Sequence, residues 1–554
     1  MKKTGIPVLK ALAILVLVNI LAEFAHTRFD LTEDRRYTLS EPSIATVEKF
    51  TSPVIIDVLL EGKLPPEFVK LRTETQQLLE EFAAENDEIE FTFVDPLDGV
   101  AEVDATIAEL QGLGLTPTQV TVQNDNKVSQ EIIFPWAMVT YNNRTVKVPL
   151  LKNKQGASTE ERINNSVQHL EYAFADAFTK TTLTEKKRVA VIKGNGELGD
   201  IYLADFLTTV RDYYNIGAIT LDSVVTNPQK VLNQLKEYDL ALVAKPTEAF
   251  SEAEKYVLDQ YIVNGGKSVW LVDQVNIALD RLFNNSGSAI ALPYELGLTD
   301  FFFKYGVRIN PNLISDMYFT QIVLATGDGK ASQYEPLPWL YHPMVFSQNN
   351  HPINTNLEAI RFQFANAIDT IANAYTKTII LKSSPLSKVD TTPRQVRLSM
   401  IDSPPDKEVF NNGGKAMAVL IEGDFSSAYA NRVKPLKLEG IKEKGNTNKM
   451  LVVSDGDIIK NQLRNGRPLE LGYDKWTSNY YGNKEFLVNA FNYLLDDTGL
   501  INIRNKQVAI PFLDEKKIIE QRTKWQLLNI GLPVVLVAIF GLLFNYFRKR
   551  KYGS

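Results

Sequence analysis

The chain has 554 residues, of which 44% are hydrophobic and 23% are charged, and it contains no cysteine. This composition is that of a globular protein of several domains, and the missing thiols exclude disulfides, thiol catalysis, iron–sulfur clusters and cysteine-bound zinc. The formal net charge of −6 becomes −13 once the seven basic residues at the two ends are set aside. Nucleic-acid binding depends on neutralising phosphates, so we expect no nucleic-acid partner for so acidic a central region.

The first predicted element is an apolar segment from Ile6 to Ala25, which follows Lys2 and Lys3 and contains Lys10. About 20 apolar residues in a helix cross a bilayer core, so we predict that residues 1–25 form a short cytoplasmic tail and a first transmembrane helix. The alternative is a cleaved signal peptide. The residues around Ala22 and Ala25 fit the small-x-small cleavage pattern poorly, which favours a retained anchor.

Residues 26–182 are predicted to form a first folded domain outside the membrane. Its pattern reads strand, helix, strand, short helix, three strands and a long helix, at 53–60, 66–84, 89–96, 103–111, 119–122, 132–141, 145–150 and from the capping box Ser158–Glu161 onward. This order is that of a thioredoxin-like domain. Residues 61–64 read Glu-Gly-Lys-Leu where a redox member would carry CxxC, so we predict a thioredoxin-like domain that lacks thiol chemistry.

Residues 183–505 are predicted to form a larger α/β domain. Strands alternate with helices that begin near 200, 228 and 251, which indicates a parallel sheet with right-handed crossovers; the strands are expected at 188–193, 218–221, 239–245 and 268–273. Later apolar runs are expected to extend this sheet, at 377–382, 416–423 and 449–457. A final amphipathic helix covers 486–495, and the tract 327–354, rich in Asn, Pro, Gly and Gln, is predicted to be loop.

The chain ends in a second apolar segment. Residues 506–526 are predicted to be a membrane-proximal connector, 527–547 a second transmembrane helix and 548–554 a cytoplasmic basic tail. Positive charges lie at the terminal side of both apolar segments, so the positive-inside rule places both termini in the cytoplasm. We therefore expect a two-span protein of the inner membrane whose large central region is periplasmic.

Several motifs imitate cofactor sites. Residues 194–199 form a literal GxGxxG between a strand and a helix, but Glu197 and Asp200 place negative charge beside the phosphate position, so we interpret the motif as a glycine-rich turn. Residues 264–268 lack the first glycine of a P-loop. Ser454-Asp-Gly-Asp457 could suggest a cation site, but such acidic pairs more often cap turns. We predict no cofactor, no metal site and no catalytic residue.

The segment Arg28-Phe-Asp-Leu-Thr-Glu-Asp-Arg-Arg-Tyr-Thr-Leu-Ser-Glu-Pro42 follows the first apolar segment. It resembles the R-x-D-L-T…Y-T-L-S signature of the auxiliary, substrate-binding-like proteins of gliding-motility-associated ABC transporters of Bacteroidetes. Similarity continues over essentially the whole chain and is clearest at 194–197, 304–311, 418–423 and 453–457. One departure is Asn195, which stands where the Gly-His-Gly-Glu pattern of the family has His. The resemblance implies that the larger domain is similar to type 1 glutamine amidotransferases, without their activity because the cysteine nucleophile is missing.

The same resemblance implies a non-enzymatic membrane subunit that works with a separate cytoplasmic ATPase subunit. It would bind an ABC permease and, on the periplasmic side, an unidentified cargo. Small and kinking residues allow close helix packing in lipid. We therefore predict a permease interface from residues beside the first span and within the second, namely Arg28, Asp30, Leu31, Arg36, Tyr37, Gly531, Pro533 and Gly541. Two alternatives remain open: a membrane-anchored periplasmic enzyme acting on cell-wall or sugar substrates, and a structural scaffold without a transport role.

Overall fold

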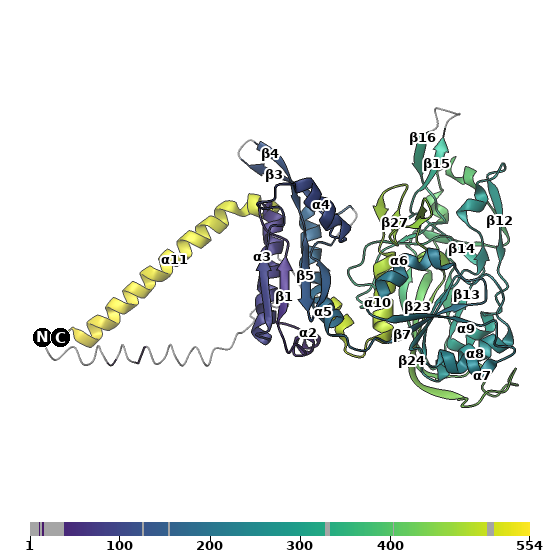
Figure 1. The fold of residues 1–554 in the computed structure, drawn as a ribbon. Helices are drawn as coiled ribbons and strands as arrows, with labels where there is room; N and C mark the ends of the chain where they lie inside the picture. The colour runs from purple at the N-terminus through teal and green to yellow at the C-terminus, as the bar shows by residue number, and fades with distance from the viewer. Residues whose placement is uncertain are drawn as a thin grey trace. The chain divides into compact units, whose positions relative to one another are not determined.

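The computed structural model describes residues 38–124, 127–152, 156–326, 333–402, 404–506 and 515–553, together with Lys10, Ile14 and Leu15. Residues 1–507 form one compact unit, and residues 508–554 form a second that contains the helix α11 (Glu515–Tyr552; Figure 1). Apart from the three isolated positions, the predicted first transmembrane helix lies outside the described residues. The described chain is a mixed α/β protein with several sheets, which confirms the predicted class.

The first sheet of unit 1 has the strand order β2-β1-β5-β6, with β1 parallel to β2 and antiparallel to β5. Its strands are β1 (Val54–Val58), β2 (Ile89–Phe93), β5 (Trp136–Tyr141) and β6 (Arg144–Pro149). The helices are α2 (Glu41–Val47), α3 (Pro66–Glu85), α4 (Val103–Gly112) and α5 (Thr159–Thr182). Phe178 of α5 meets Phe50 and Phe82 edge to face, at centroid distances of 5.4 and 5.1 Å, and so fixes α5 on this core.

Two features of this region depend only on neighbouring residues, a hairpin turn and a helix cap. Asn142 and Asn143 have positive φ, 47° and 65°, as a two-residue hairpin turn between β5 and β6 requires. Ser158 and Glu161 form the expected capping box at the start of α5. The predicted single strand at 132–141 is wrong, because Pro135 has no N–H and separates β4 (Lys127–Ile133), which pairs only with β3 (Thr118–Asn124), from β5.

The large sheet of unit 1 has nine strands in the order β13-β19-β23-β24-β10-β9-β7-β8, with β20 also paired to β23. Five neighbouring strands run parallel: β8 (Asn215–Thr220), β7 (Arg188–Lys193), β9 (Leu240–Ala244), β10 (Lys267–Leu271) and β24 (Lys444–Val453). The other four strands pair antiparallel with their neighbours: β23 (Ala416–Ser426) with β24, β20 (Thr376–Lys382) and β19 (Ile368–Thr370) with β23, and β13 (Val307–Ile309) with β19. The prediction of a parallel sheet is therefore wrong for this half, because no crossover helix links β23 to β24.

Helices cover both faces of the large sheet, as continuously apolar strands require. Alternate residues of β7 enter different cores: Val189 and Val191 pack with α6 (Asp200–Val210) and α10 (Asn483–Leu495). Ala190 and Ile192 pack on the other face, with α7 (Pro228–Leu235), α8 (Glu252–Val263) and α9 (Thr299–Tyr305). Figure 1 shows these last three helices together on one side of the sheet.

Smaller sheets surround this core. They are made by β11 (Val275–Asn276), β12 (Ser288–Pro293), β22 (Arg394–Arg397), β14 (Asn312–Asp316), β21 (Ser387–Thr391), β15 (Ile322–Thr326), β16 (Gln333–Leu337), β17 (Met344–Val345), β18 (Ile360–Arg361), β25 (Leu463–Arg464), β26 (Arg467–Pro468), β27 (Tyr473–Asp474) and β28 (Asn479–Tyr480). The tract 327–354 was predicted to be loop, but its described part contains β16 and β17. Trp339 and Tyr341 are buried there with Phe364, and this aromatic cluster organises the tract despite its Asn- and Pro-rich sequence.

Candidate functional site

The predicted permease interface falls on two regions. Arg28, Asp30, Leu31, Arg36 and Tyr37 lie outside the described residues. The rest lies in α11, which is the one helix of the described chain that is long and apolar enough to cross a membrane, over residues 521–551.

The three predicted positions in α11 do not share one face. At about 100° per residue, Pro533 lies about 200° around the helix from Gly531. By the same count, Ala538 and Gly541 lie within about 80° of Gly531. Gly531, Ala538 and Gly541 therefore lie on one side of the helix, and Pro533, which is inside it, lies opposite Gly531.

A buried carboxylate joins the two ends of unit 1. Glu171 of α5 accepts hydrogen bonds from Ser40 N (2.7 Å) and Ser43 Oγ (2.9 Å), which open the described N-terminal region. Its other oxygen accepts from Lys506 Nζ (2.7 Å), next to the last residue of this unit, and the same ammonium donates to Thr38 O (2.7 Å). We call these five residues the terminal joint.

The charge of Glu171 depends on this arrangement. Burial alone raises the pKa of Glu171, whose side chain is 9% exposed. The Lys506 ammonium and the hydrogen bonds from Lys506 and Ser40 outweigh burial, and the net pKa is lowered. Glu171 is therefore ionised at neutral pH and holds both ends of the unit together through charge-assisted hydrogen bonds.

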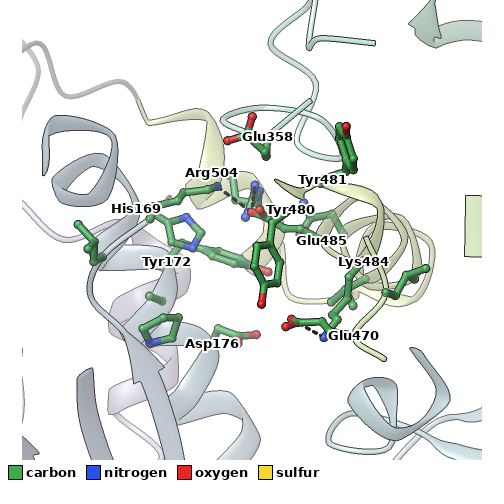
Figure 2. Close-up of a pocket in the computed structure, with 18 of the residues that line it drawn as sticks. His169, Tyr172, Asp176, Glu358, Glu470, Tyr480, Tyr481, Lys484, Glu485 and Arg504 are labelled. Carbon is green, nitrogen blue, oxygen red and sulfur yellow. Dashed lines mark hydrogen bonds and ion pairs between the residues drawn. The ribbon is translucent and has the colours of Figure 1, made fainter. Parts of the chain in front are cut away.

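A cleft of about 610 Å³ lies beside the terminal joint, between α5 on one wall and α10 with the β27–β28 hairpin on the other (Figure 2). One stripe of α5 lines it at helical spacing: His169, Tyr172, Ala173, Asp176 and Lys180. The opposite wall contributes Tyr480, Tyr481, Lys484, Glu485, Val488 and Asn489, and the 3-10 helix η6 (Leu500–Asn505) contributes Arg504.

One end of the cleft holds an ion triad. Glu485 Oε1 accepts from Lys152 Nζ at 2.8 Å and from Arg504 Nη2 at 2.9 Å. Burial raises the pKa of Glu485, but both cations oppose it and the net pKa falls to about 2. Burial lowers the pKa of Lys152 to about 8, against the attraction of Glu485. All three groups are charged at pH 7, and burial next to Lys152 keeps the pKa of His169 well below its usual value, so its imidazole is neutral.

The other end of the cleft is organised by Asp176. Its Oδ2 accepts from Tyr213 OH (3.0 Å) and faces Lys180 Nζ (3.0 Å), which in turn lies over the Tyr213 ring. Figure 2 shows Asp176 on the α5 wall and Glu470 on the opposite wall. Among the described residues, the buried atoms Asp176 Oδ1 and Arg504 Nε have no hydrogen-bond partner; the two side chains are 13% and 1% exposed.

Sequence reasoning did not find this cleft. The apolar residues of α5 recur at helical spacing and are buried, namely Ile163, Val167, Leu170, Phe174 and Phe178. The remaining face of α5 repeats polar and aromatic residues every three or four positions. That second stripe was a usable signal for a surface facing another element, but it does not reveal which element.

The backbone of Asn195, in the glycine-rich turn at 194–199, is hydrogen-bonded within the protein. The Asn195 carbonyl accepts from Thr247 N (2.9 Å) and Glu248 N (3.0 Å), and Asn195 N donates to Glu197 Oε2 (2.8 Å). A backbone amide that could face a phosphate is thus taken by the chain's own carboxylate. A Cβ on Gly196 would lie 2.2 Å from Thr247 Oγ1, so this glycine permits close packing of two loops.

The suggested cation position at 454–457 holds a lysine. Lys245, in the left-handed backbone region (φ 54°) after β9, pairs with Asp273 (3.0 Å) and with Asp457. Asp455 accepts from Gln363 N (2.5 Å) and Asp457 N (2.7 Å), so it caps backbone amides. Over the described ranges, no group of three or more histidine or acidic side chains is arranged to hold a metal ion.

Comparison with solved structures gives a weak match. A chain titled "mmIFT52 N-terminal domain" aligns with 12% sequence identity and a TM-score of 0.31, over 56% of this chain and 98% of that one. No curated protein resembles the chain significantly. None of these comparisons supports a thioredoxin-like or an amidotransferase-like assignment, and both stay predictions.

Two family models match the sequence. Residues 33–140 match a domain of unknown function, and residues 186–490 match the model described as an ABC-type uncharacterized transport system. The second match covers more than half of the chain and includes the large sheet and most of α10. The chain therefore belongs to the family of auxiliary components of ABC-type transport systems.

Proposed function

We propose that the chain is a non-enzymatic membrane subunit that binds the permease of an ABC transporter and works with a separate cytoplasmic ATPase subunit. The observation that carries this proposal is the family match over residues 186–490, in a chain that ends in an exposed apolar helix with a basic last turn. Its resemblance to gliding-motility-associated auxiliary proteins points to gliding motility and surface secretion as the process served. Thioredoxin-like and amidotransferase-like modules remain part of this proposal.

The terminal joint supports the proposed two-span topology. Thr38 and Lys506, near the two ends of unit 1, are connected by a hydrogen bond of 2.7 Å. The first and last residues of the continuously described part of unit 1 therefore lie side by side. Two spans can enter the same bilayer from such a point without unfolding the unit between them. Basic residues at both ends of the sequence favour cytoplasmic termini and a periplasmic central region.

The contacts of the cleft favour binding over catalysis. General acid–base catalysis uses a group whose pKa lies near the working pH and which can reach the substrate. The carboxylates of Glu485 and Asp176 are instead held by neighbouring cations. Lys152 has a pKa lowered to about 8, but its ammonium is engaged by Glu485 and by the Asn356 carbonyl rather than directed at a substrate. We therefore rank the alternative of a periplasmic enzyme acting on cell-wall or sugar substrates below the auxiliary role.

Purification of the tagged full-length protein in mild detergent tests the auxiliary role. We expect a multispan permease and a P-loop ATPase to copurify and to be identified by mass spectrometry. Recovery of the protein without either subunit, from membranes in which both are present, would contradict the proposal.

Cysteine labelling tests the topology, because the natural chain has no cysteine. Val225 and Val433 are 76% and 94% exposed, so a cysteine at either position should remove little packing. A membrane-impermeant maleimide should label Val225→Cys and Val433→Cys from the periplasm, and Ser554→Cys only after lysis. The reverse pattern would place the folded unit in the cytoplasm.

A further inference from the structure

The cleft between α5 and α10 carries two buried hydrogen-bonding atoms that the protein itself does not use. Within the described residues, Asp176 Oδ1 is an acceptor without a donor and Arg504 Nε is a donor without an acceptor. Both side chains line the same cleft, and leaving such groups unpaired is unfavourable. A ligand with hydroxyl groups satisfies both atoms, since each hydroxyl can donate and accept.

Aromatic rings line the same space. Tyr172, Tyr213, Tyr480 and Tyr481 contribute to its walls. Tyr480 is 53% exposed and packs on Tyr473, at 4.8 Å between ring centroids, on the β27–β28 hairpin. Beyond it the exposed Trp476 packs near Tyr334, at 5.7 Å. Tyr480 thus presents an exposed, flat and amphipathic side chain to the cleft.

Most of the charged side chains that line the cleft have a partner within the protein. Arg504 and Lys152 share Glu485, Lys180 faces Asp176, and Lys484 Nζ bonds to Glu470 at 2.7 Å. Lys147 Nζ donates to Leu113 O at 2.7 Å. An anion would have to compete with an internal carboxylate for these cations. The cleft is therefore suited to a ligand that is polar but carries no net charge.

We propose that this cleft binds an uncharged oligosaccharide, with one sugar ring against Tyr480 and hydroxyl groups bonded to Asp176 and Arg504. A pyranose has apolar ring faces and a polar rim, which matches aromatic walls that also carry planar hydrogen-bonding groups. This proposal concerns the ligand of the cleft and does not depend on association with a transporter.

Calorimetry on the full-length protein tests the proposal. The protein is kept in a detergent without a sugar headgroup, and the probes are chitohexaose and cellohexaose, with inorganic phosphate and a hexa-alanine peptide as comparisons. We expect at least one hexasaccharide to bind with a dissociation constant below 1 mM, roughly the weak end of specific affinities, and neither comparison to bind.

Two variants and a matched control locate the binding. Tyr480→Ala removes an exposed ring and should weaken binding about three- to tenfold. Asp176→Asn should weaken it about tenfold through loss of a charged acceptor. Tyr318→Ala removes an exposed tyrosine that does not line the cleft and should bind as the natural protein does. The proposal is overturned if neither glycan binds, if Tyr480→Ala binds them unchanged, or if phosphate or the peptide binds instead.

Discussion

Replacement of Glu171 by glutamine should open the terminal joint while leaving the rest of unit 1 folded. The substitution removes the ion pair with Lys506 and weakens the acceptors for Ser40 N and Ser43 Oγ. Removing one partner of a fully buried pair costs about 3–5 kcal/mol. The Lys506 side chain is 20% exposed and regains water when released, so we expect a loss of about 2–3 kcal/mol in local stability.

Hydrogen exchange on the full-length protein measures this loss where it occurs. A change of 2–3 kcal/mol corresponds to about 30- to 150-fold faster exchange, which we expect in residues 38–47 and 500–506. Glu160→Gln, at an exposed position of the same helix, should change neither segment. In combination with Lys506→Met the effect should be less than additive. Unchanged exchange of both segments in Glu171→Gln would refute the idea that this carboxylate joins them.

Further predictions concern pH, packing and ligands. Burial lowers the pKa of His342 well below its usual value, so the free energy of unfolding should fall as the pH drops below about 6.5, where the unfolded chain takes up the proton. Thermal unfolding of His342→Leu should show a weaker dependence of stability on pH in this range. A Cβ on Gly456 would lie 2.6 Å from the Lys245 stem, so Gly456→Ala should destabilise by about 1–3 kcal/mol in urea unfolding, whereas Gly112→Ala, with open space around it, should not. Calorimetry with NADH or ATP should give no heat of binding, because Asn195 N already donates to Glu197; a micromolar constant would contradict this.

Features set by local chemistry could be predicted from the sequence. The Asn142–Asn143 turn needs two residues that tolerate positive φ, and the Ser158–Glu161 capping box needs only neighbours three positions apart. The β–α alternation from β7 to β10 follows from hydrophobic periods that are equally local. These elements therefore lie close to their expected bounds.

Features set by pairing between distant segments could not be predicted from the sequence. The direction of β23 depends on which strand it joins, and its apolar run is the same for a parallel or an antiparallel partner. The aromatic cluster around Trp339 draws on Phe364, which lies in another segment. Nothing in the local sequence of a polar tract indicates that such a cluster forms.

The candidate site also depends on pairing between segments that are far apart in the sequence. Glu171 and Lys506 are 335 positions apart, and Lys152 and Glu485 are 333 apart. Single charged residues at such separations carry no signal of pairing, and only the fold brings them together. The cleft exists because the fold places α5 and α10 on its opposite walls.

Replacement of residues 527–547 by polyleucine in the full-length protein tests the central claim most directly, because it removes the residues through which α11 would contact a permease and keeps its length. A matched variant restores only Gly531, Ala538 and Gly541 in the polyleucine helix. We predict that both variants insert into the membrane and fold, that polyleucine loses the permease on purification in mild detergent, and that the restored variant recovers it. Copurification of the permease with polyleucine at the natural yield would contradict the account and make α11 an anchor only.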